Sequence, residues 1–487
     1  MKNKKMAYDI NEMPPKKEAI ILAFQHLFAM FGATILVPIL VNAQAGHEVL
    51  TIPVALVTSG IGTLLYILCT KAKSPVYLGS SFAFIAPVAA AYLKEGISGA
   101  MTGIMAVGLV YILVAIIIHF VGKKWLEKLL PPVVIGPMIM IIGLGLAPSA
   151  ISQIGLAEGT AFDWKVLVVA LVSFLTTAIV MTKAKGFFKI IPFLVGIITG
   201  YIFACMLGMI DFAPVGDADW FSLPSFKLVF KDYGLNFRAL ITIVPIALVT
   251  LCEHIGDHTS LSNIIGKDLI EDPGLDRTLL GDGLATFVAG AIGGPANTTY
   301  GENTSVVGMT KVASVKVIGL AAVFAIVFGF LGKLTALFGT IPNAVLGGVS
   351  LLLYGFIAVN GLKVLIKNQV NFEDSKNVIV ASSMLVLGLG GAAVAITNGD
   401  FSLTISGMSL AAVVGIILNS FLSSDDDNVA TLIDDDKAVR RLKNDIKSEL
   451  TVELKEDILK AIKEEMNKNN NNNNRNNIYH KERKWNQ

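Results

Sequence analysis

Charged side chains that end an apolar stretch are the first sign of chemistry in this sequence. The stretch that begins at Ala239 ends in Glu253, His254, Asp257 and His258. Glu253 and Asp257 are four residues apart and therefore share one face of a helix. Such a pair can hold a shared proton, because the first charge opposes the second ionisation. The alternative is that the cluster marks the end of a membrane span, where charge costs little; it applies to Asp257 and His258 more than to Glu253.

Two other polar segments interrupt apolar sequence. Gly293–Thr310 combines glycine, asparagine and threonine with Glu302, at the point where an extended stretch would become a short helix. Pro75–Pro87 has a similar pattern, with an extended piece at 76–79 and a short helix from about Ser80. Irregular backbone at membrane depth is tolerated only where it is buried in protein or lines a cavity. An extramembrane loop is the alternative for Gly293–Thr310, but that segment lacks Lys and Arg.

These interruptions predict a binding site between two halves of a transporter. Matching breaks in the two halves of a chain indicate inverted repeats, and the segments Tyr77–Ser80 and Tyr300–Glu302 are weakly similar to each other. Free N–H groups at two helix N-termini would donate to substrate oxygens, and carboxylates would accept from substrate N–H groups. A small, flat, neutral molecule with both amide groups would fit. An inorganic anion would be repelled by Glu253 and Glu302 unless they were protonated, whereas a cation would also fit.

The elements that must position these residues are membrane spans. Of the 487 residues, 54% are hydrophobic and only 16% are charged, against about 25% charged in soluble domains. The mean hydropathy is +0.66. Apolar stretches predict fourteen spans, at 19–41, 50–70, 82–92, 99–121, 130–148, 165–182, 187–209, 238–257, 279–295, 303–310, 314–339, 341–361, 377–397 and 403–422. A helical span needs about 20 apolar residues, so the third and tenth are too short to cross as plain helices.

Lysine distribution predicts the orientation. Lysines gather near residues 2–17, 71–73, 123–128, 183–189 and 363–367, whereas the loops 42–49 and 148–164 have neither Lys nor Arg. By the positive-inside rule, both termini are cytoplasmic, the number of spans is even, and the protein is placed in the cytoplasmic membrane. Residues 1–18 form a polar N-terminus without a cleavable signal, because the next apolar stretch is too long for an h-region.

The remaining features suggest no further chemistry. Cys69, Cys205 and Cys252 lie far apart in apolar stretches, so neither a disulfide nor a metal site is expected, and no enzyme motif stands out. Residues 423–487 form a predicted cytoplasmic tail, with an amphipathic helical pattern from Val439 to Ile462 and a disordered asparagine run. No cofactor and no nucleic-acid partner are expected.

Several segments, in the right order, resemble the motifs of the nucleobase–ascorbate transporter family. They are L-F-A-M-F-G-A-T at 27–34, Y-L-G-S-S-F-A-F-I at 77–85, E-H-I-G at 253–256, P-N-T-T-Y-G-E-N with Ala296 inserted after Pro295, and G-G-V-S-L-L-L-Y-G at 347–355. The resemblance covers residues 15–422 and is strongest to the bacterial branch that takes up uracil.

The resemblance implies an all-α polytopic fold of fourteen spans in two inverted repeats of seven. A core domain would comprise 19–121 and 238–339, and a gate domain 130–209 and 341–422, within a transporter domain of 19–422. The third and tenth spans would begin as short antiparallel strands, with the substrate between them. The implied function is uracil uptake by proton symport with alternating access, in a homodimer embedded in the lipid bilayer.

The resemblance also implies site residues. Glu253 and Glu302 would bind uracil, Gly301 and Phe82 would offer backbone N–H groups to a carbonyl, and Tyr354 would face the site from the gate. The expected substrate site comprises Glu253, Glu302, Phe82, Gly301, Tyr354, Ser81 and Asn303.

Two departures from the family pattern bear on this site. Ser305 replaces a glycine, and Asp257 stands where uracil permeases have a histidine, with His258 one residue further on. Proton coupling is therefore expected at Asp257, His258 or Glu253. His26, in the first span, is another candidate, although a hydrogen-bonded core histidine is the simpler interpretation.

Three rival functions remain open. A xanthine or other purine permease would use the same fold. An anion transporter of the related sulfate and bicarbonate type is disfavoured by Glu253 and Glu302. A nucleobase-binding membrane sensor would use the tail at 423–487 to signal to a partner.

Overall fold

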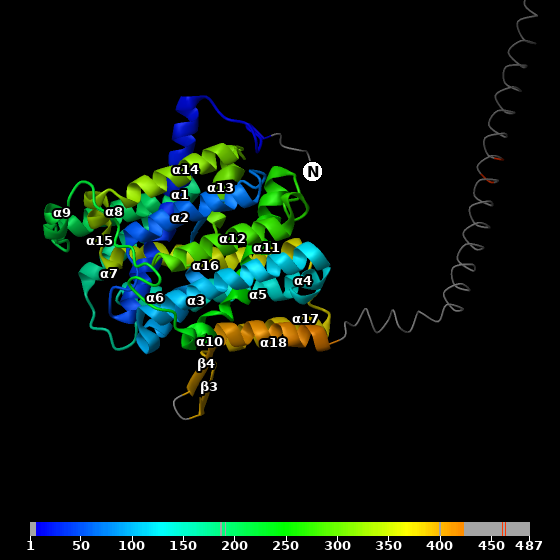
Figure 1. Ribbon diagram of the computed structural model, residues 1–487. Coiled ribbons are helices and arrows are strands. Elements are labelled where there is room, and N and C mark those ends of the chain that lie inside the picture. Colours follow the sequence, from blue (N-terminus) through cyan, green and yellow to red (C-terminus); the bar gives the residue numbers. More distant parts are fainter. Residues whose placement is uncertain are drawn as a thin grey trace, which may run out of the picture. The chain divides into compact units, whose positions relative to one another are not determined.

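The computed structural model describes residues 6–185, 188–189, 191–398, 401–422, 460 and 463. The chain divides into two compact units, one of residues 1–373 and 377–422 and the other of residues 374–376 and 423–487. Apart from two lysine positions, the predicted amphipathic tail lies outside the described residues. The first unit contains the elements described below (Figure 1), except residues 375–376 at the start of one helix, which belong to the second unit.

The first part of the chain supplies three long helices, one short strand and one 3₁₀ turn. They are α1 (Lys16–Ala45), α2 (Ile52–Cys69), β1 (Leu78–Ser80), the 3₁₀ turn η1 (Phe82–Phe84) and α3 (Ile85–Val121). The predicted third and fourth spans are the two arms of α3, which bends at Gly96. Gly96 has φ +66°, a left-handed conformation that glycine adopts without steric cost.

A set of shorter helices follows. They are α4 (Lys124–Leu129), α5 (Pro132–Gly145), α6 (Ala147–Gln153), α7 (Trp164–Lys183), α8 (Pro192–Met206) and α9 (Ala213–Asp217). Both α5 and α8 have proline in the first turn, where its missing N–H has no helical partner to lose.

The second part repeats the order of long helix, strand and helix. It contains η3 (Phe237–Ala239), α10 (Leu240–Ile243), α11 (Ile246–Ile265), η4 (Ile270–Gly274), α12 (Leu275–Ala291), β2 (Asn297–Thr299), α13 (Gly301–Thr310), α14 (Val315–Gly329), α15 (Gly332–Gly339), α16 (Asn343–Lys367), α17 (Ser375–Leu389), β3 (Ala393–Asn398), β4 (Phe401–Ser406) and α18 (Gly407–Phe421).

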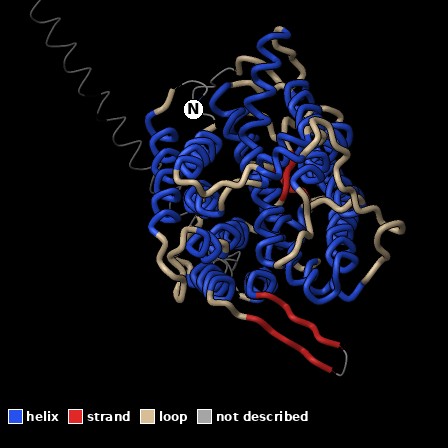
Figure 2. The backbone as a smooth tube through the Cα atoms, turned by 90° about the vertical axis from the view of Figure 1, so that its left-hand side faces the viewer, coloured by secondary structure: helices blue, strands red, loops and turns tan. Residues whose placement is uncertain are grey.

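The two short strands predicted in the third and tenth spans are present. β1 pairs antiparallel with β2, with Leu78 opposite Thr299 and Ser80 opposite Asn297. Figure 2 shows this pair in red among the helices, and every residue of both strands is buried. Pairing satisfies the backbone N–H and C=O groups of segments that are not helical, which is essential where no water is available.

Helices α1 and α2 pack against β1, and α11 and α12 pack against β2. α3 packs along α12, and α2 packs against α14 and α12, while α16 packs against α5 and α7. Some contacts require glycine: a Cβ on Gly108 of α3 would stand 2.5 Å from the Phe287 nitrogen of α12. Small residues at membrane helix interfaces allow the backbones to approach closely.

Several predicted spans differ from the helices of the structure. The eighth span continues to Ile265, and the helices α14 and α15, predicted as one span at 314–339, bend by 82° at their junction. The helix predicted at 377–397 ends at Leu389, and the helix predicted at 403–422 begins at Gly407. Between them lies the β3–β4 hairpin, which projects from the helical body in Figure 2. Alternation of apolar and polar residues from Phe401 to Ser406 and the Gly-Asp dipeptide at 399–400, between the last paired residues Asn398 and Phe401, favour a hairpin there.

Length and composition identify fewer complete spans than the fourteen predicted. Among the described residues, six helices are long and apolar enough to cross a membrane, or up to eight if each bent pair is one span. Three shorter apolar helices, α8, α17 and α18, accompany them. The chain is therefore a mostly helical polytopic membrane protein.

The N-terminal segment before α1 is tied to the loop after α13. The Ala313 N–H donates to the Tyr8 carbonyl over 2.9 Å, and the Val315 N–H donates to the Ile10 carbonyl over 3.0 Å. The Asp9 carboxylate lies 2.7 Å from the Lys267 ammonium. This hydrogen-bonded ammonium, together with the Ile10 N–H, holds the pKa of Asp9 below its usual range.

Candidate functional site

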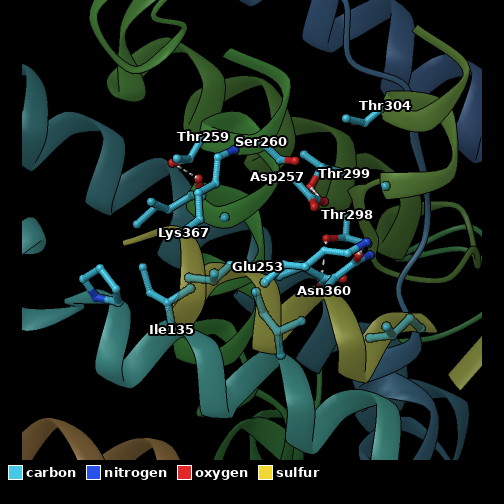
Figure 3. Close-up of a pocket in the computed structure, with 18 of the residues that line it drawn as sticks. Ile135, Glu253, Asp257, Thr259, Ser260, Thr298, Thr299, Thr304, Asn360 and Lys367 are labelled. Carbon is cyan, nitrogen blue, oxygen red and sulfur yellow. Dashed lines mark hydrogen bonds between the residues drawn. The ribbon is translucent and has the colours of Figure 1, made fainter. Parts of the chain in front are cut away.

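A cavity of about 740 Å³ lies where α5, α11, β2, α13 and α16 meet (Figure 3). Glu253 and Asp257 of α11, Glu302 of α13 and Asn360 of α16 line it. The cavity thus gathers polar groups from elements that are far apart in the sequence, whereas its remaining wall includes apolar side chains such as Ile135 of α5.

Glu253 and Asp257 face the cavity from one side of α11, as their four-residue spacing predicted. Each carboxylate accepts a hydrogen bond from strand β2: Thr298 Oγ1 donates to Glu253 Oε2 over 3.2 Å, and Thr299 Oγ1 donates to Asp257 Oδ2 over 2.6 Å. In Figure 3 the two threonines lie next to these carboxylates. The strand therefore fixes the orientation of both carboxylates, and sequence reasoning had given the threonines no role.

The helix that carries Glu253 and Asp257 does not end at these charges. α11 continues for two further turns, to Ile265, and Leu261 and Ile265 are buried. Both carboxylates are therefore in the interior of the helix.

Glu302 lies in the first turn of α13, directly after β2. The first N–H groups of a helix have no partner within it and carry a partial positive charge. Gly301, which begins α13, leaves space beside them: a Cβ there would stand 3.9 Å from Asp257 Oδ1 and 3.8 Å from Asn360 Nδ2. Glu302 also lines a second cavity of about 10 Å³, against Gly32 of α1 and Phe193 of α8.

Phe82 and Tyr354 form one aromatic contact at the cavity. Phe82 begins η1 after β1 and lines the cavity, and its ring meets that of Tyr354 edge-on, with centroids 6.0 Å apart at 77°. Tyr354 is buried behind Phe82 and is not part of the cavity wall. Ser81 is also outside the wall, because it belongs to the strand pairing: its N–H donates to the Ala296 carbonyl over 2.9 Å.

Asn303 points away from the cavity and connects α13 to α1. Its Nδ2 donates to the His26 carbonyl over 3.0 Å and lies 3.2 Å from His26 Nδ1. His26 is buried in this contact, which agrees with its interpretation as a core histidine. Both residues therefore position the helix that carries Glu302.

His258 lies on the other side of α11, outside the cavity wall. Its Nδ1 is 2.7 Å from the His254 carbonyl, which only accepts, so Nδ1 carries the proton. Its Nε2 then accepts from the Tyr66 hydroxyl over 2.6 Å. Of the two residues next to each other in the sequence, the structure brings Asp257 to the cavity and directs His258 into the protein.

Sequence reasoning missed a buried acid behind the site. Asp282 of α12 accepts from His254 Nδ1 over 2.8 Å, and both side chains are fully buried. The other ring nitrogen of His254 lies 3.1 Å from Thr278 Oγ1. The signal was present in the sequence, because Asp282 interrupts the apolar stretch predicted at 279–295, and an acidic residue inside a span is rarely without a role.

The arrangement can bind a small polar solute and hold protons. Glu253, Asp257 and Glu302 offer carboxylate oxygens, and the start of α13 offers N–H groups. Three carboxylates that line one cavity cannot all be ionised cheaply, because each charge opposes the next. Binding of a group that donates hydrogen bonds, or of a proton, would lower this cost.

Comparisons with known proteins show the family to which the chain belongs. Residues 17–397 match the model of a family described as a permease family. The chain is 47% identical over 428 residues to the uracil permease of Bacillus subtilis (strain 168), which covers 87% of this chain and 96% of that protein. It is 42% identical over 417 residues to the uracil permease of Escherichia coli (strain K12), covering 85% and 93%.

Solved structures with a similar fold are more distant in sequence. The transmembrane domain of a cyanobacterium bicarbonate transporter, BicA, aligns with a TM-score of 0.56 at 15% identity, covering 84% of this chain and 99% of that one. The murine anion transporter Slc26a9 in the inward-facing state aligns with a TM-score of 0.59 at 12% identity, covering 84% and 68%. At these identities the likeness shows a shared transporter fold and nothing of the substrate.

Proposed function

The chain belongs to the permease family, and from this premise we propose that it carries uracil across the cytoplasmic membrane by proton symport. Membership confirms the resemblance seen in the sequence motifs, and makes the chain an integral membrane transporter rather than an enzyme. The proposal that the substrate is uracil is supported by one observation: Glu253 and Glu302 line one cavity in a chain 47% identical to a uracil permease.

The proposed binding mode matches the hydrogen-bonding groups of uracil to those of the cavity. The two ring N–H groups of uracil would donate to the carboxylates of Glu253 and Glu302. A ring carbonyl would accept from the backbone N–H groups at Gly301 and Phe82, where two helical segments begin. Phe82 would offer its ring to the flat base, supported from behind by Tyr354.

Three further predicted residues would act at a distance from uracil. Asn303 would hold α13 in place through His26, and Ser81 would hold η1 through the strand pair. His258 would support α11 through its hydrogen bond with Tyr66. Their proposed role is to position the residues that touch the base.

The proposed proton site is the carboxylate pair of Glu253 and Asp257. Uracil is neutral, so a proton that enters with it would neutralise one carboxylate of a cluster in which simultaneous ionisation is unfavourable. Asp257 has the better placement for this role, because it lines the cavity whereas His258 does not.

The proposed transport cycle is alternating access between a core and a gate. The core would comprise 19–121 and 238–339 and the gate 130–209 and 341–422, arranged as fourteen spans in two inverted repeats. Lys367 and Asn368 line the cavity. Lys367 belongs to the lysine cluster at 363–367, which the positive-inside rule assigns to the cytoplasm. The cavity therefore corresponds to an inward-open state, with both termini in the cytoplasm.

The opposite side of the site would be closed by an apolar seam. There Gly32 of α1 stands close to the gate helix α8, since a Cβ on Gly32 would lie 3.4 Å from Ile197 Cδ1. Outward opening would separate these helices while the contacts within each domain persist. The family resemblance also favours a homodimer.

Uracil binding to Glu302→Gln tests the proposed site. The change keeps the size of the side chain but removes its charge, and a hydrogen bond to a charged group contributes about 1.5–3 kcal/mol. We expect the uracil Kd of the purified protein to rise about 10- to 150-fold. Glu48→Gln, at an exposed loop position, is the matched control and should bind as the wild type.

Two results would change the proposal. An unchanged Kd in Glu302→Gln would remove Glu302 from the site. Displacement of uracil by xanthine at similar concentrations would shift the substrate to the purine alternative while leaving the cavity as the binding site.

A further inference from the structure

Asn360 is a polar residue of the cavity to which neither the motifs nor the comparisons assign a role. It lies on α16 and lines the cavity, and Figure 3 shows it beside Glu253 and Thr298. The space above Gly301 separates its amide from Asp257: a Cβ on Gly301 would stand 3.8 Å from Asn360 Nδ2 and 3.9 Å from Asp257 Oδ1. This is the space beside the N–H groups that begin α13.

The orientation of the Asn360 amide is fixed by its neighbour one turn along. The Lys363 ammonium donates to Asn360 Oδ1 over 3.2 Å and stands 5.1 Å from the centre of the Phe356 ring. An ammonium group only donates hydrogen bonds, so the oxygen of the amide must face Lys363. The nitrogen, with its two N–H donors, is thereby turned toward Gly301 and the substrate space.

We propose that Asn360 binds the substrate, donating from Nδ2 to a ring carbonyl and so selecting a carbonyl over an amino group at that ring position. This inference rests on the proposed function, because it assigns a partner to one carbonyl of uracil. Carboxylates recognise the N–H groups of the base, and an amide held in this orientation recognises an acceptor. If an amino group faced the Asn360 amide, two donors would meet and neither would have an acceptor. Leaving both groups unpaired discriminates between ligands more strongly than the loss of an apolar contact would.

The position of Asn360 gives the contact a second consequence. Glu253 and Glu302 belong to the proposed core, whereas Asn360 belongs to the proposed gate. A base held by both would join the two domains across the cavity, and its loss would free them. Asn360 would therefore affect how tightly the substrate is held in the inward-open state.

Two substitutions separate this role from a structural one. Asn360→Ala removes the donor, and Asn360→Asp keeps the size and the contact with Lys363 but replaces the donor with an acceptor. In uptake of radiolabelled uracil we expect Asn360→Ala to raise KM about tenfold, the equivalent of one hydrogen bond of about 1.4 kcal/mol. Asn360→Asp should raise KM further, because two acceptors would face each other.

Competition by cytosine provides a readout that altered folding would not produce. Cytosine carries an amino group in place of one carbonyl of uracil and lacks one ring N–H. The missing N–H weakens its contact with the carboxylates in the wild type and the variant alike, so Asn360→Asp should raise the effectiveness of cytosine relative to uracil as a competitor. Asn263→Ala, an exposed amide on α11 that donates to the Thr259 carbonyl, is the control and should transport as the wild type.

The outcomes distinguish this inference from the function on which it rests. If the wild type takes up uracil but Asn360→Ala has a KM within twofold of the wild type, Asn360 does not bind the base. An Asn360→Asp variant with the KM and cytosine competition of Asn360→Ala would also overturn the selection of a carbonyl. If the wild type takes up no uracil at all, the proposed function fails first.

Discussion

The hydrogen bond between Thr298 and Glu253 is the contact through which strand β2 should affect uracil binding. Thr298 is buried, and its Oγ1 donates to Glu253 Oε2 over 3.2 Å. Thr298→Val keeps the branched shape and the strand propensity but removes the hydroxyl. A hydrogen bond to a charged group contributes about 1.5–3 kcal/mol, which corresponds to about 10- to 150-fold in affinity if the free carboxylate no longer holds its binding orientation.

The assay is uracil binding to the purified protein, with Thr298→Ser as the matched variant. Serine keeps the hydroxyl and loses only a methyl group, so it should bind within a few-fold of the wild type. The reasoning would be refuted if Val and Ser variants bound uracil equally well, because the hydroxyl would then not orient Glu253. A melting temperature equal to that of the wild type would show that the strand pair is intact in both variants.

Two further predictions concern the structure behind the site. Gly79→Ala should destabilise the protein by about 1–3 kcal/mol, because its Cβ would stand 2.4 Å from the ring of Tyr300. The control in a thermal-shift measurement is Gly145→Ala, whose Cβ would meet nothing within 4 Å. Equal melting temperatures of the two variants would contradict the expectation. Asp282→Ala should cost about 1–3 kcal/mol, because it leaves Nδ1 of the buried His254 without a hydrogen-bond partner. Asp282→Asn should cost less, because its amide oxygen can still accept from His254 Nδ1, and similar losses in melting temperature for the two variants would be evidence against the pair.

Sequence patterns pointed to three segments that contribute residues to the cavity: the end of the eighth span, Gly293–Thr310 and Pro75–Pro87. Glycine and polar residues inside apolar sequence located both broken spans, and the spacing of Glu253 and Asp257 placed them on one helix face. Sequence similarity did not align the two broken segments, Pro75–Pro87 and Gly293–Thr310, correctly. In the structure the strand-to-helix junctions make Phe82 and Gly301 equivalent, whereas the weak similarity had matched Tyr77 with Tyr300, which in fact lie side by side across the strand pair.

Contacts between distant elements were beyond the reach of sequence patterns. Thr298 and Asn360 face α11 only because β2 and α16 pack beside it, and no local spacing encodes that packing. The placement of His258 shows the same limit. It differs from Asp257 by one residue, or about 100° around the helix, and that rotation directs it to Tyr66 instead of the cavity.

The hairpin after α17 was missed for a different reason. Its residues are apolar enough to resemble the end of one span and the start of the next, and hydropathy alone does not separate a strand from a helix. The period-two alternation and the Gly-Asp dipeptide at 399–400 were the signals that distinguish them.

The measurement that tests the central claim most directly is uptake of radiolabelled uracil into proteoliposomes, with and without an inward proton gradient. We predict accumulation above the external concentration when the gradient is present, its loss when a protonophore is added, and no competition by xanthine. Uracil uptake that only equilibrates and ignores the gradient would contradict proton symport. No uracil uptake under either condition would contradict the proposed substrate.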